Sequence, residues 1–478
     1  MSILETLRAF LKRRGERVYL VGGSVRDVLL RRETHDLDVA VQGSARNLAR
    51  AFADEIRAAF YLMDEEFDVA RVILENADGS RDIVDFARQR GNSMAQDLAT
   101  RDFTINAMAA DAAAWNGDPN EIIDPFNGRA DLAAQRVRVV SEAVFEHDAV
   151  RLLRAARMEA EFDFVLEDDT EKLLRRDAPF IESAPMERVR DELMKIIAAP
   201  NVLRNLNRLD ALDLLGRVLP EVNAMRGVTQ SPPHVYEVLE HSLRAVAAAE
   251  ETERAGYLNL AQGAFGAQLR EHFSQMVSGA RTRRELLRLA LLLHDVGKPA
   301  TRAVDEAGRI RFLTHEKIGA EIVGPALRRL KFSNEEIAHV KTIVANHMRP
   351  LWLSESGVSN RAVYRFFRAT GDAGVDVIVH SWCDQRAIFG GETDDPEIHA
   401  LHAVIGKLLD RFYHAHAQVV APPSLVNGGD VMRALNIPGG PRVGEILDAV
   451  REAQAVGEVT TRAQAIERIL QLAQPQKI

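Results

Sequence analysis

The sequence is poor in cysteine, with Cys383 the only one among 478 residues. A single cysteine excludes an internal disulfide framework and fits a reducing cytoplasm. No apolar run reaches the roughly 18 residues that a membrane-spanning helix needs. Residues 1–17 have the pattern of an amphipathic helix and not of a signal peptide. We therefore expect a cytoplasmic globular protein without a membrane segment.

Positive charge is in deficit, because 61 Lys and Arg face 70 Asp and Glu, a formal net charge of −9. This balance excludes a protein that coats nucleic acid with its whole surface, so any RNA contact must be regional. Repeats of fixed period and low-complexity tracts are also missing. A chain of 478 residues is too long for a single core, and two to four domains are expected.

The stretch from Val18 to Val41 has the strongest pattern in the chain. Residues 18–21 are apolar and predict a buried strand that ends in a tight turn at Gly22-Gly23. Ser24 is the expected N-cap of the helix that follows. The free backbone N–H groups of such a turn can cradle a phosphate group.

A second strand carries Asp36 and Asp38, whose side chains share one face because residues i and i+2 of a strand do so. Either a glycine turn or an Asp pair alone is usually structural, but their combination favours a site. Paired carboxylates suit magnesium and substrate phosphates, which indicates metal-assisted phosphoryl or nucleotidyl transfer. Asp85, in the expected strand 82–86, is a candidate third carboxylate.

Two further segments carry candidate site residues. Arg101 and Asp102 precede an expected apolar helix that contains Asn106. Farther on, three arginines recur at intervals of three on one helical face, just after Asp148. Such a row is usually solvated, but an Asp and Arg pair can also meet the Watson–Crick edge of a pyrimidine or of adenine. The three arginines are Arg151, Arg154 and Arg157.

Six motifs follow one another in the order LVGGSVRD, DLD, TRDFTINAMA, DPFNG, HDAVRLLRAAR and ERVRDEL. Over residues 15–225 this series resembles the bacterial tRNA nucleotidyltransferase and poly(A) polymerase family, within the polymerase-beta-like nucleotidyltransferase superfamily. The resemblance implies an α+β fold, in which a head with a small mixed sheet precedes all-α neck, HD and tail domains. It also implies tRNA, CTP and ATP as partners.

The resemblance further implies roles for single residues. Asp36 and Asp38 would ligate catalytic Mg²⁺, and Asp85 would be a third catalytic carboxylate. Gly22, Gly23 and Arg26 would hold the triphosphate. Arg101, Asp102 and Asn106 would help to place the ribose, and Asp148 with Arg151 would select the base. The implied nucleotide-binding residues are Gly22, Gly23, Arg26, Asp27, Arg101, Asp102, Asn106, Asp148, Arg151, Arg154 and Arg157.

The chain departs from the family pattern at three positions. Thr100 stands where an Arg is usual, His147 where a Glu is usual, and Arg31 where a Gly is common. The segment 90–101 is short, as in the CC-adding branch, although some CCA-adding members are compact there too. Addition of CC, addition of CCA and poly(A) synthesis all remain open.

Downstream, histidines and aspartates recur at the ends of apolar helical segments, in a pattern that suits a transition metal. They are His241, His294, Asp295, His315, His347 and Asp384. Over about residues 234–390 the series resembles the HD phosphohydrolase superfamily. That resemblance implies a core site of His241, His294, Asp295 and Asp384, with a second metal position at His315 and His347. Mn, Ni, Fe or Zn could then activate water against a phosphoester; the alternative is an RNA-binding scaffold.

The expected domains are a nucleotidyltransferase head at 1–140, a helical neck at 141–230, an HD domain at 231–395 and a helical tail at 396–478 that contacts tRNA. An insertion at 250–285 has no readable function. A signalling hydrolase dominated by the HD site is a further alternative, but the retained head residues argue against an inactive head. The sequence leaves the oligomeric state open.

Overall fold

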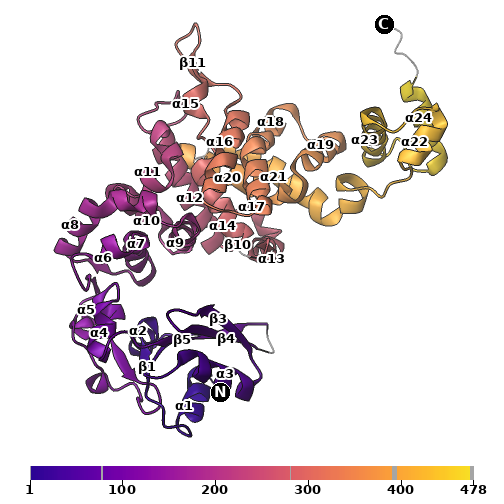
Figure 1. Ribbon diagram of the computed structural model, residues 1–478. Coiled ribbons are helices and arrows are strands. Elements are labelled where there is room, and N and C mark those ends of the chain that lie inside the picture. Colours follow the sequence, from indigo (N-terminus) through magenta and orange to yellow (C-terminus); the bar gives the residue numbers. More distant parts are fainter. Residues whose placement is uncertain (1, 77–78, 280, 390–395, 474–478) are drawn as a thin grey trace. The chain divides into compact units, whose positions relative to one another are not determined.

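The computed structural model describes residues 2–76, 79–279, 281–389 and 396–473 (Figure 1). The chain divides into two compact units. The first consists of Met1–Ile196 and Ala211–Leu214, and the second of Ile197–Asp210 and Leu215–Ile478. None of the described helices is both long enough and apolar enough to cross a membrane.

A six-stranded mixed sheet organises the first unit (Figure 1). The strands lie in the order β3 (Ala59–Asp64), β4 (Val69–Glu75), β5 (Arg81–Arg88), β2 (Asp36–Val41), β1 (Val18–Val21) and β6 (Ala109–Asp111). Strands β2 and β5 are parallel, and the other neighbours are antiparallel. The predicted strands are therefore confirmed. The sequence Asn-Ala-Asp-Gly at 76–79 predicts a hairpin turn between β4 and β5, but residues 77 and 78 lie outside the described residues.

Alternation along β2 decides which face of the sheet is buried. Leu37 and Val39 are each 1% exposed, while the aspartates between them face the other way. Helix α3 (Ala45–Ile56) covers the buried face and begins after its N-cap Ser44, whose hydroxyl accepts a hydrogen bond from the backbone N–H of Asn47. Hydrophobic burial on one face thus leaves the opposite face free for polar chemistry.

Two local predictions in this unit are wrong. Helix α2 (Gly23–Leu29) has Gly22 as its N-cap, so Ser24 lies inside the helix and caps nothing. The expected helix around Asn106 is a single 3₁₀ turn, η1 (Thr104–Asn106), followed by strand β6. Strand pairing with β1 overrides the apolar helical pattern there, because it satisfies the backbone of residues 109–111.

Helices complete the first unit, as the sequence predicted for its second half. They include α4 (Met94–Ala99), α5 (Gly128–Ala133), α6 (Val144–His147), α7 (Val150–Phe162), α8 (Asp168–Asp177) and most of α9 (Met186–Ala198). Helix α7 buries Leu152, Leu153 and Met158, and its arginine row lies on another face.

The second unit is helical. Its centre consists of α12 (Val238–Arg254), α14 (Arg283–Leu293), α16 (His315–Arg329), α17 (Asn334–Asn346) and α20 (Gly374–Phe389), which pack on one another. Around them lie α13 (Gly266–Ser274), α19 (Asn360–Thr370), α21 (Pro396–His414) and the π-helical turn η7 (His416–Val420). The last helices, α22 (Gly428–Leu435), α23 (Pro441–Ala455) and α24 (Arg462–Ala473), share a separate small core.

Candidate active site and metal centre

Three carboxylates meet on the open face of the first unit's sheet. Asp36 and Asp38 lie two residues apart on β2, and the parallel register places Asp38 directly beside Asp85 on β5. Asp85 is held by Arg71 of β4, whose Nε and Nη2 both donate to it at 2.7 Å. The structure therefore brings the three predicted acidic residues together and adds an arginine that the sequence analysis missed.

The glycine turn lies against this acidic group. Gly22 has φ +66°, and a Cβ atom there would lie 2.8 Å from Nη1 of Arg101 and 3.5 Å from Oδ2 of Asp38. The hydroxyl of Ser24 accepts a hydrogen bond from the backbone N–H of Asp38 at 2.7 Å, which ties α2 to β2. The backbone angle favours glycine at this position, and a side chain there would also have to displace the end of Arg101.

The carboxylate of Asp38 is poorly hydrated although the residue reaches solvent, because neighbouring groups crowd it. This loss of hydration raises the pKa of Asp38 to about 6, against the opposing charge of Arg101 and with support from Asp85 and Asp36. Asp38 thus lies in a crowded acidic site with arginines nearby, which is the environment expected where a cation and phosphates bind.

The arginine predicted to hold the triphosphate is engaged in internal contacts. Arg26 is 7% exposed, and its Nε donates to Asp27 at 2.9 Å while Nη1 donates to Asn106 at 2.6 Å. Its guanidinium also lies 4.5 Å from the centre of the Phe162 ring. Arg26, Asp27 and Asn106 therefore form one network that fixes the middle of α2 to η1.

The arginine row of α7 is not a solvated face. Nη1 of Arg154 donates to Asp102 at 2.9 Å and its Nε to Glu192 at 3.3 Å, and Nε of Arg157 donates to Glu192 at 2.7 Å. Burial alone would raise the pKa of Asp102, but the charge of Arg154 holds it below its usual value. Since Asn106 also donates to Asp102 at 3.1 Å, these arginines brace the Arg26 network.

The predicted base-reading pair lies at the start of α7. Nη2 of Arg151 donates to the backbone carbonyl of Thr100 at 3.0 Å, and its Nε lies 3.9 Å from Oδ2 of Asp148. Arg188 of α9 grips Asp148 with two hydrogen bonds of 3.1 and 2.7 Å. Any residue at position 100 would supply this carbonyl. The hydrogen bond from Arg151 therefore does not depend on the Thr100 side chain, which stands where the family usually has Arg.

In the second unit, all six predicted metal ligands converge. Their ligand atoms form three overlapping groups: His241 with His294 and Asp295, His294 with His347 and Asp384, and Asp295 with His315 and His347. Nε2 of His241 lies 2.8 Å from Asp384, and the Nε2 atoms of His315 and His347 lie 3.2 Å apart. They come from α12, α16, α20 and the C-terminal ends of α14 and α17.

The donor atoms of this centre fit a transition metal. In His294, His315 and His347, Nδ1 lies 2.7 Å from a backbone carbonyl, which fixes the proton on Nδ1 and turns Nε2 inward. Within the described part of the chain, Nε2 of His294 and Oδ1 of Asp295 are buried without a hydrogen-bond partner. Such orphaned imidazole and carboxylate atoms are what an ion would satisfy.

Charge at this centre is concentrated around Asp295. The ammonium of Lys298 lies 2.7 Å from its Oδ2. Burial disfavours a charged His294, yet the charges of Asp295 and Asp384 outweigh it and raise the pKa of His294 to about 10. Burial lowers the pKa of His347 to about 3, which leaves that imidazole neutral and able to ligate.

The structure adds residues that the sequence analysis missed. His380 is fully buried beside His294 and His347, with ring centres 5.1 and 5.4 Å away, and it precedes Asp384 by one helical turn, a spacing that could have revealed it. Arg71 could have been found by pairing β4 with β5 across their turn. Nothing local distinguishes Arg188, which reaches Asp148 only through the packing of α9.

Three family models match the chain in succession. A "Poly A polymerase head domain" matches residues 18–138, a "Probable RNA and SrmB- binding site of polymerase A" matches 163–226, and an "HD domain" matches 238–369.

Characterised relatives are similar over almost the whole chain. An A-adding tRNA nucleotidyltransferase of Deinococcus radiodurans is 32% identical and covers 93% of both chains. A CC-adding tRNA nucleotidyltransferase of Geobacter sulfurreducens is 30% identical over 97% of this chain and 94% of its own. A solved CCA-adding enzyme in complex with ATP has a TM-score of 0.61 at 21% identity, over 100% of this chain and 94% of that one. The structural likeness shows a common fold.

Proposed function

Since the chain belongs to the tRNA nucleotidyltransferase and poly(A) polymerase family, we propose that it extends the 3′ end of tRNA with cytidine nucleotides taken from CTP. The observation that carries the proposal is the convergence of Asp36, Asp38 and Asp85 on one face of the sheet, beside Arg101 and the Gly22 turn. In this reaction the 3′-oxygen of the RNA bonds to the α-phosphorus, and pyrophosphate leaves.

The carboxylates fit magnesium, which prefers oxygen ligands and keeps substrate phosphates in its shell. Asp36 and Asp38 would hold the two ions of a two-metal centre, which supply positive charge against the triphosphate and the attacking oxygen. The chain's own groups position the rest. Ser24 fixes the backbone of Asp38 and Arg71 fixes Asp85, while Arg101 places a positive charge beside the turn that faces the phosphates.

Asp148 and Arg151 support a choice of cytosine or adenine. A carboxylate accepts from the exocyclic amino group of either base, and a guanidinium donates to the adjacent ring nitrogen. Uracil and guanine present the opposite order, a carbonyl beside a ring N–H, so neither side chain would meet a complementary group on those bases. Arg188 orients Asp148 for this contact with two hydrogen bonds, and its removal should relax base selection.

Product length on defined tRNAs tests the proposal. We would incubate tRNA that lacks its CCA end with each single nucleotide and with CTP plus ATP, in magnesium. CTP alone should be incorporated, whereas GTP and UTP should not. No incorporation of C with any divalent ion would overturn the proposal.

A second candidate is addition of the terminal A, favoured by the Deinococcus relative at 32% identity. It predicts that tRNA ending in CC accepts one A from ATP while tRNA lacking CC accepts nothing. The short segment 90–101 is folded here into the capped helix α4, with the backbone N–H of Arg90 donating to Asp97, and it favours CC addition over full CCA addition. Long tails made from ATP would instead identify a poly(A) polymerase.

The HD centre supports a second, metal-dependent activity. We propose that His241, His294, Asp295 and Asp384 hold one transition-metal ion and that His315 and His347 complete a second position. Bound ions of Mn, Ni, Fe or Zn would activate water toward a phosphoester, such as a cyclic phosphate on a damaged RNA end. Lys298 would hold the second oxygen of Asp295 in place.

Paired variants separate the two centres. Asp38→Asn should abolish nucleotide addition and leave the transition-metal content of the HD centre unchanged. His294→Ala should remove bound metal, measured by mass spectrometry, and any hydrolysis of cyclic phosphates, while addition persists. His339→Ala, at a buried histidine outside the centre, is the matched control. If His294→Ala keeps its metal content and its hydrolysis of cyclic phosphates, the proposed metal site is wrong and the HD domain is a scaffold.

A further inference from the structure

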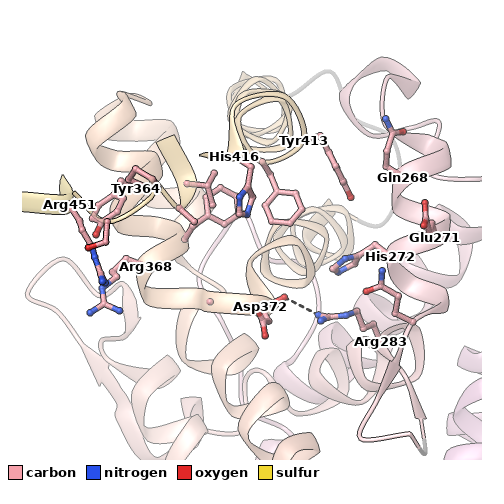
Figure 2. Close-up of a pocket in the computed structure, with 18 residues that line it drawn as sticks. Gln268, Glu271, His272, Arg283, Tyr364, Arg368, Asp372, Tyr413, His416 and Arg451 are labelled. Carbon is pink, nitrogen blue, oxygen red and sulfur yellow. Dashed lines mark hydrogen bonds between the residues drawn. The ribbon is translucent and has the colours of Figure 1, made fainter. Parts of the chain in front are cut away.

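A cavity of about 720 Å³ lies in the second unit, away from the HD centre (Figure 2). Its walls come from α13, the start of α14, α19, the end of α21 with η7, and α23. The insertion that had no readable function in the sequence therefore supplies one side of this cavity. In Figure 2, Arg451 and Arg368 lie at one end, and Glu271, His272 and Arg283 lie at the other.

Aromatic side chains line the space between the two ends. Phe412 stacks on Phe367 with ring centres 5.3 Å apart, and it meets Tyr413 and His416 edge-on at 5.0 and 5.3 Å. Tyr364 adds a further ring. Because these rings fix one another, they present a rigid surface of the kind on which a flat heteroaromatic ring stacks.

The end nearest α13 is polar and incompletely satisfied. The hydroxyl of Tyr413 is buried without a hydrogen-bond partner among the described residues, as is Nε of Arg283. Burial raises the pKa of Tyr413 to about 12, so the hydroxyl remains a donor. Gln268, Glu271 and Gln275 add amide and carboxylate groups, the types that meet the edge of a nucleobase.

A buried carboxylate outside the cavity wall holds this polar end in place. The buried carboxylate of Asp376 lies 2.9 Å from Nε2 of His272, 3.0 Å from Nη1 of Arg283 and 3.0 Å from Nε2 of His339. Arg283 also donates to the backbone carbonyl of Asp372 at 2.9 Å (Figure 2). The groups at this end are thus fixed before any ligand arrives, which lowers the entropy cost of binding.

The opposite end carries positive charge. Arg368 is neutralised by Asp448 through two contacts of 2.8 and 2.6 Å, whereas Arg451 forms no ion pair with any described residue. An unpaired guanidinium at the mouth of a cavity is a natural partner for phosphate.

We propose that this cavity binds a free nucleoside 5′-monophosphate, with its base among the aromatic rings, its edge toward Tyr413 and Glu271, and its phosphate on Arg451. The volume falls within the range of about 300–1,000 Å³ that small-molecule sites occupy. The proposal is independent of which nucleotide the head adds to tRNA.

Binding is measured with the full-length protein in EDTA, with radiolabelled AMP and CMP in equilibrium dialysis. Without divalent ions and without a triphosphate, the head lacks most of its contacts. Arg451→Gln should raise the Kd at least about tenfold, because it removes a charged contact, and Tyr413→Phe about threefold to tenfold. Arg442→Gln is the matched control: it makes the same change on the same helix but outside the cavity, and should bind like the parent.

Photolabelling locates the bound nucleotide. After irradiation with 8-azido-AMP, peptide mapping should place the label in residues 412–424, and Arg451→Gln should lose it. Label confined to residues 18–138 or to the HD centre would overturn the proposal. So would equal affinity of Arg451→Gln and Arg442→Gln, or the absence of saturable binding in the parent protein.

Discussion

Replacement of Gly22 by Ala tests the close approach on which the proposed active site depends. Gly22 has φ +66° and ψ −134°, a conformation that is essentially restricted to glycine. An added Cβ would also lie 2.8 Å from Nη1 of Arg101, less than any real contact of this kind. The variant therefore strains the backbone and displaces Arg101 from its place beside Asp38.

The two effects have different magnitudes and different consequences. Backbone strain at such a position costs on the order of 1–3 kcal/mol of folding free energy. Displacing Arg101 loses a charge-assisted contact to the bound phosphates, worth about 1.5–3 kcal/mol. At about 1.4 kcal/mol for each factor of ten, kcat/KM for nucleotide addition should fall about 10- to 150-fold.

Gly15→Ala is the matched control, because Gly15 has φ +77° and no atom within 4 Å of the Cβ that would be added. It imposes strain without a clash. Hydrogen exchange of residues 18–29 should report local destabilisation in Gly22→Ala, and steady-state assays on tRNA report the loss of activity. If Gly22→Ala retains the kcat/KM of Gly15→Ala, the role assigned to Arg101 is refuted.

Three further predictions concern stability. Arg31 has φ +55° in an exposed turn where the family commonly has Gly, so Arg31→Gly should stabilise the first unit by up to about 1 kcal/mol in urea unfolding; a loss would contradict this. Glu192→Gln removes the carboxylate shared by two arginines and should cost about 1–3 kcal/mol in the same assay, whereas a neutral result would show that the network is dispensable. Burial opposes the charged form of Asp376, but hydrogen bonds from two histidines lower its pKa below the unfolded value of about 3.9. The stabilisation by the Asp376 carboxylate is therefore complete above the unfolded pKa and is lost as pH falls through the lowered folded pKa. The thermal midpoint of Asp376→Asn should lie farthest below that of the parent near pH 7, and this difference should narrow below about pH 4. A difference that stays constant with pH would show that the pKa of Asp376 is not linked to folding.

The sequence predicted those features that depend on local periodicity. Alternation in β2 was enough to place Asp36 and Asp38 on one face, because the side-chain period of a strand is two whatever surrounds it. The N-cap of α3 at Ser44 is local in the same way, since a cap needs only its own turn. The prediction of Ser24 as a cap rested on a similar pattern but was wrong. The helix begins at Gly23 with Gly22 as its cap, and the hydroxyl of Ser24 accepts a hydrogen bond from the backbone N–H of Asp38 in β2.

Only the tertiary structure decided which distant groups meet. The sequence supplied the six HD ligands, but their convergence from separate helices, with His380 among them, required long-range packing. The pairing of Asp38 with Asp85 depended on a parallel register between strands more than forty residues apart. Likewise, the arginine row of α7 has the pattern of a solvated face, and only the approach of Glu192 and Asp102 turned it inward. Residue type and spacing set the chemistry that each segment can offer, whereas burial and hydrogen bonding across the whole core select which of those groups lie within reach of one another.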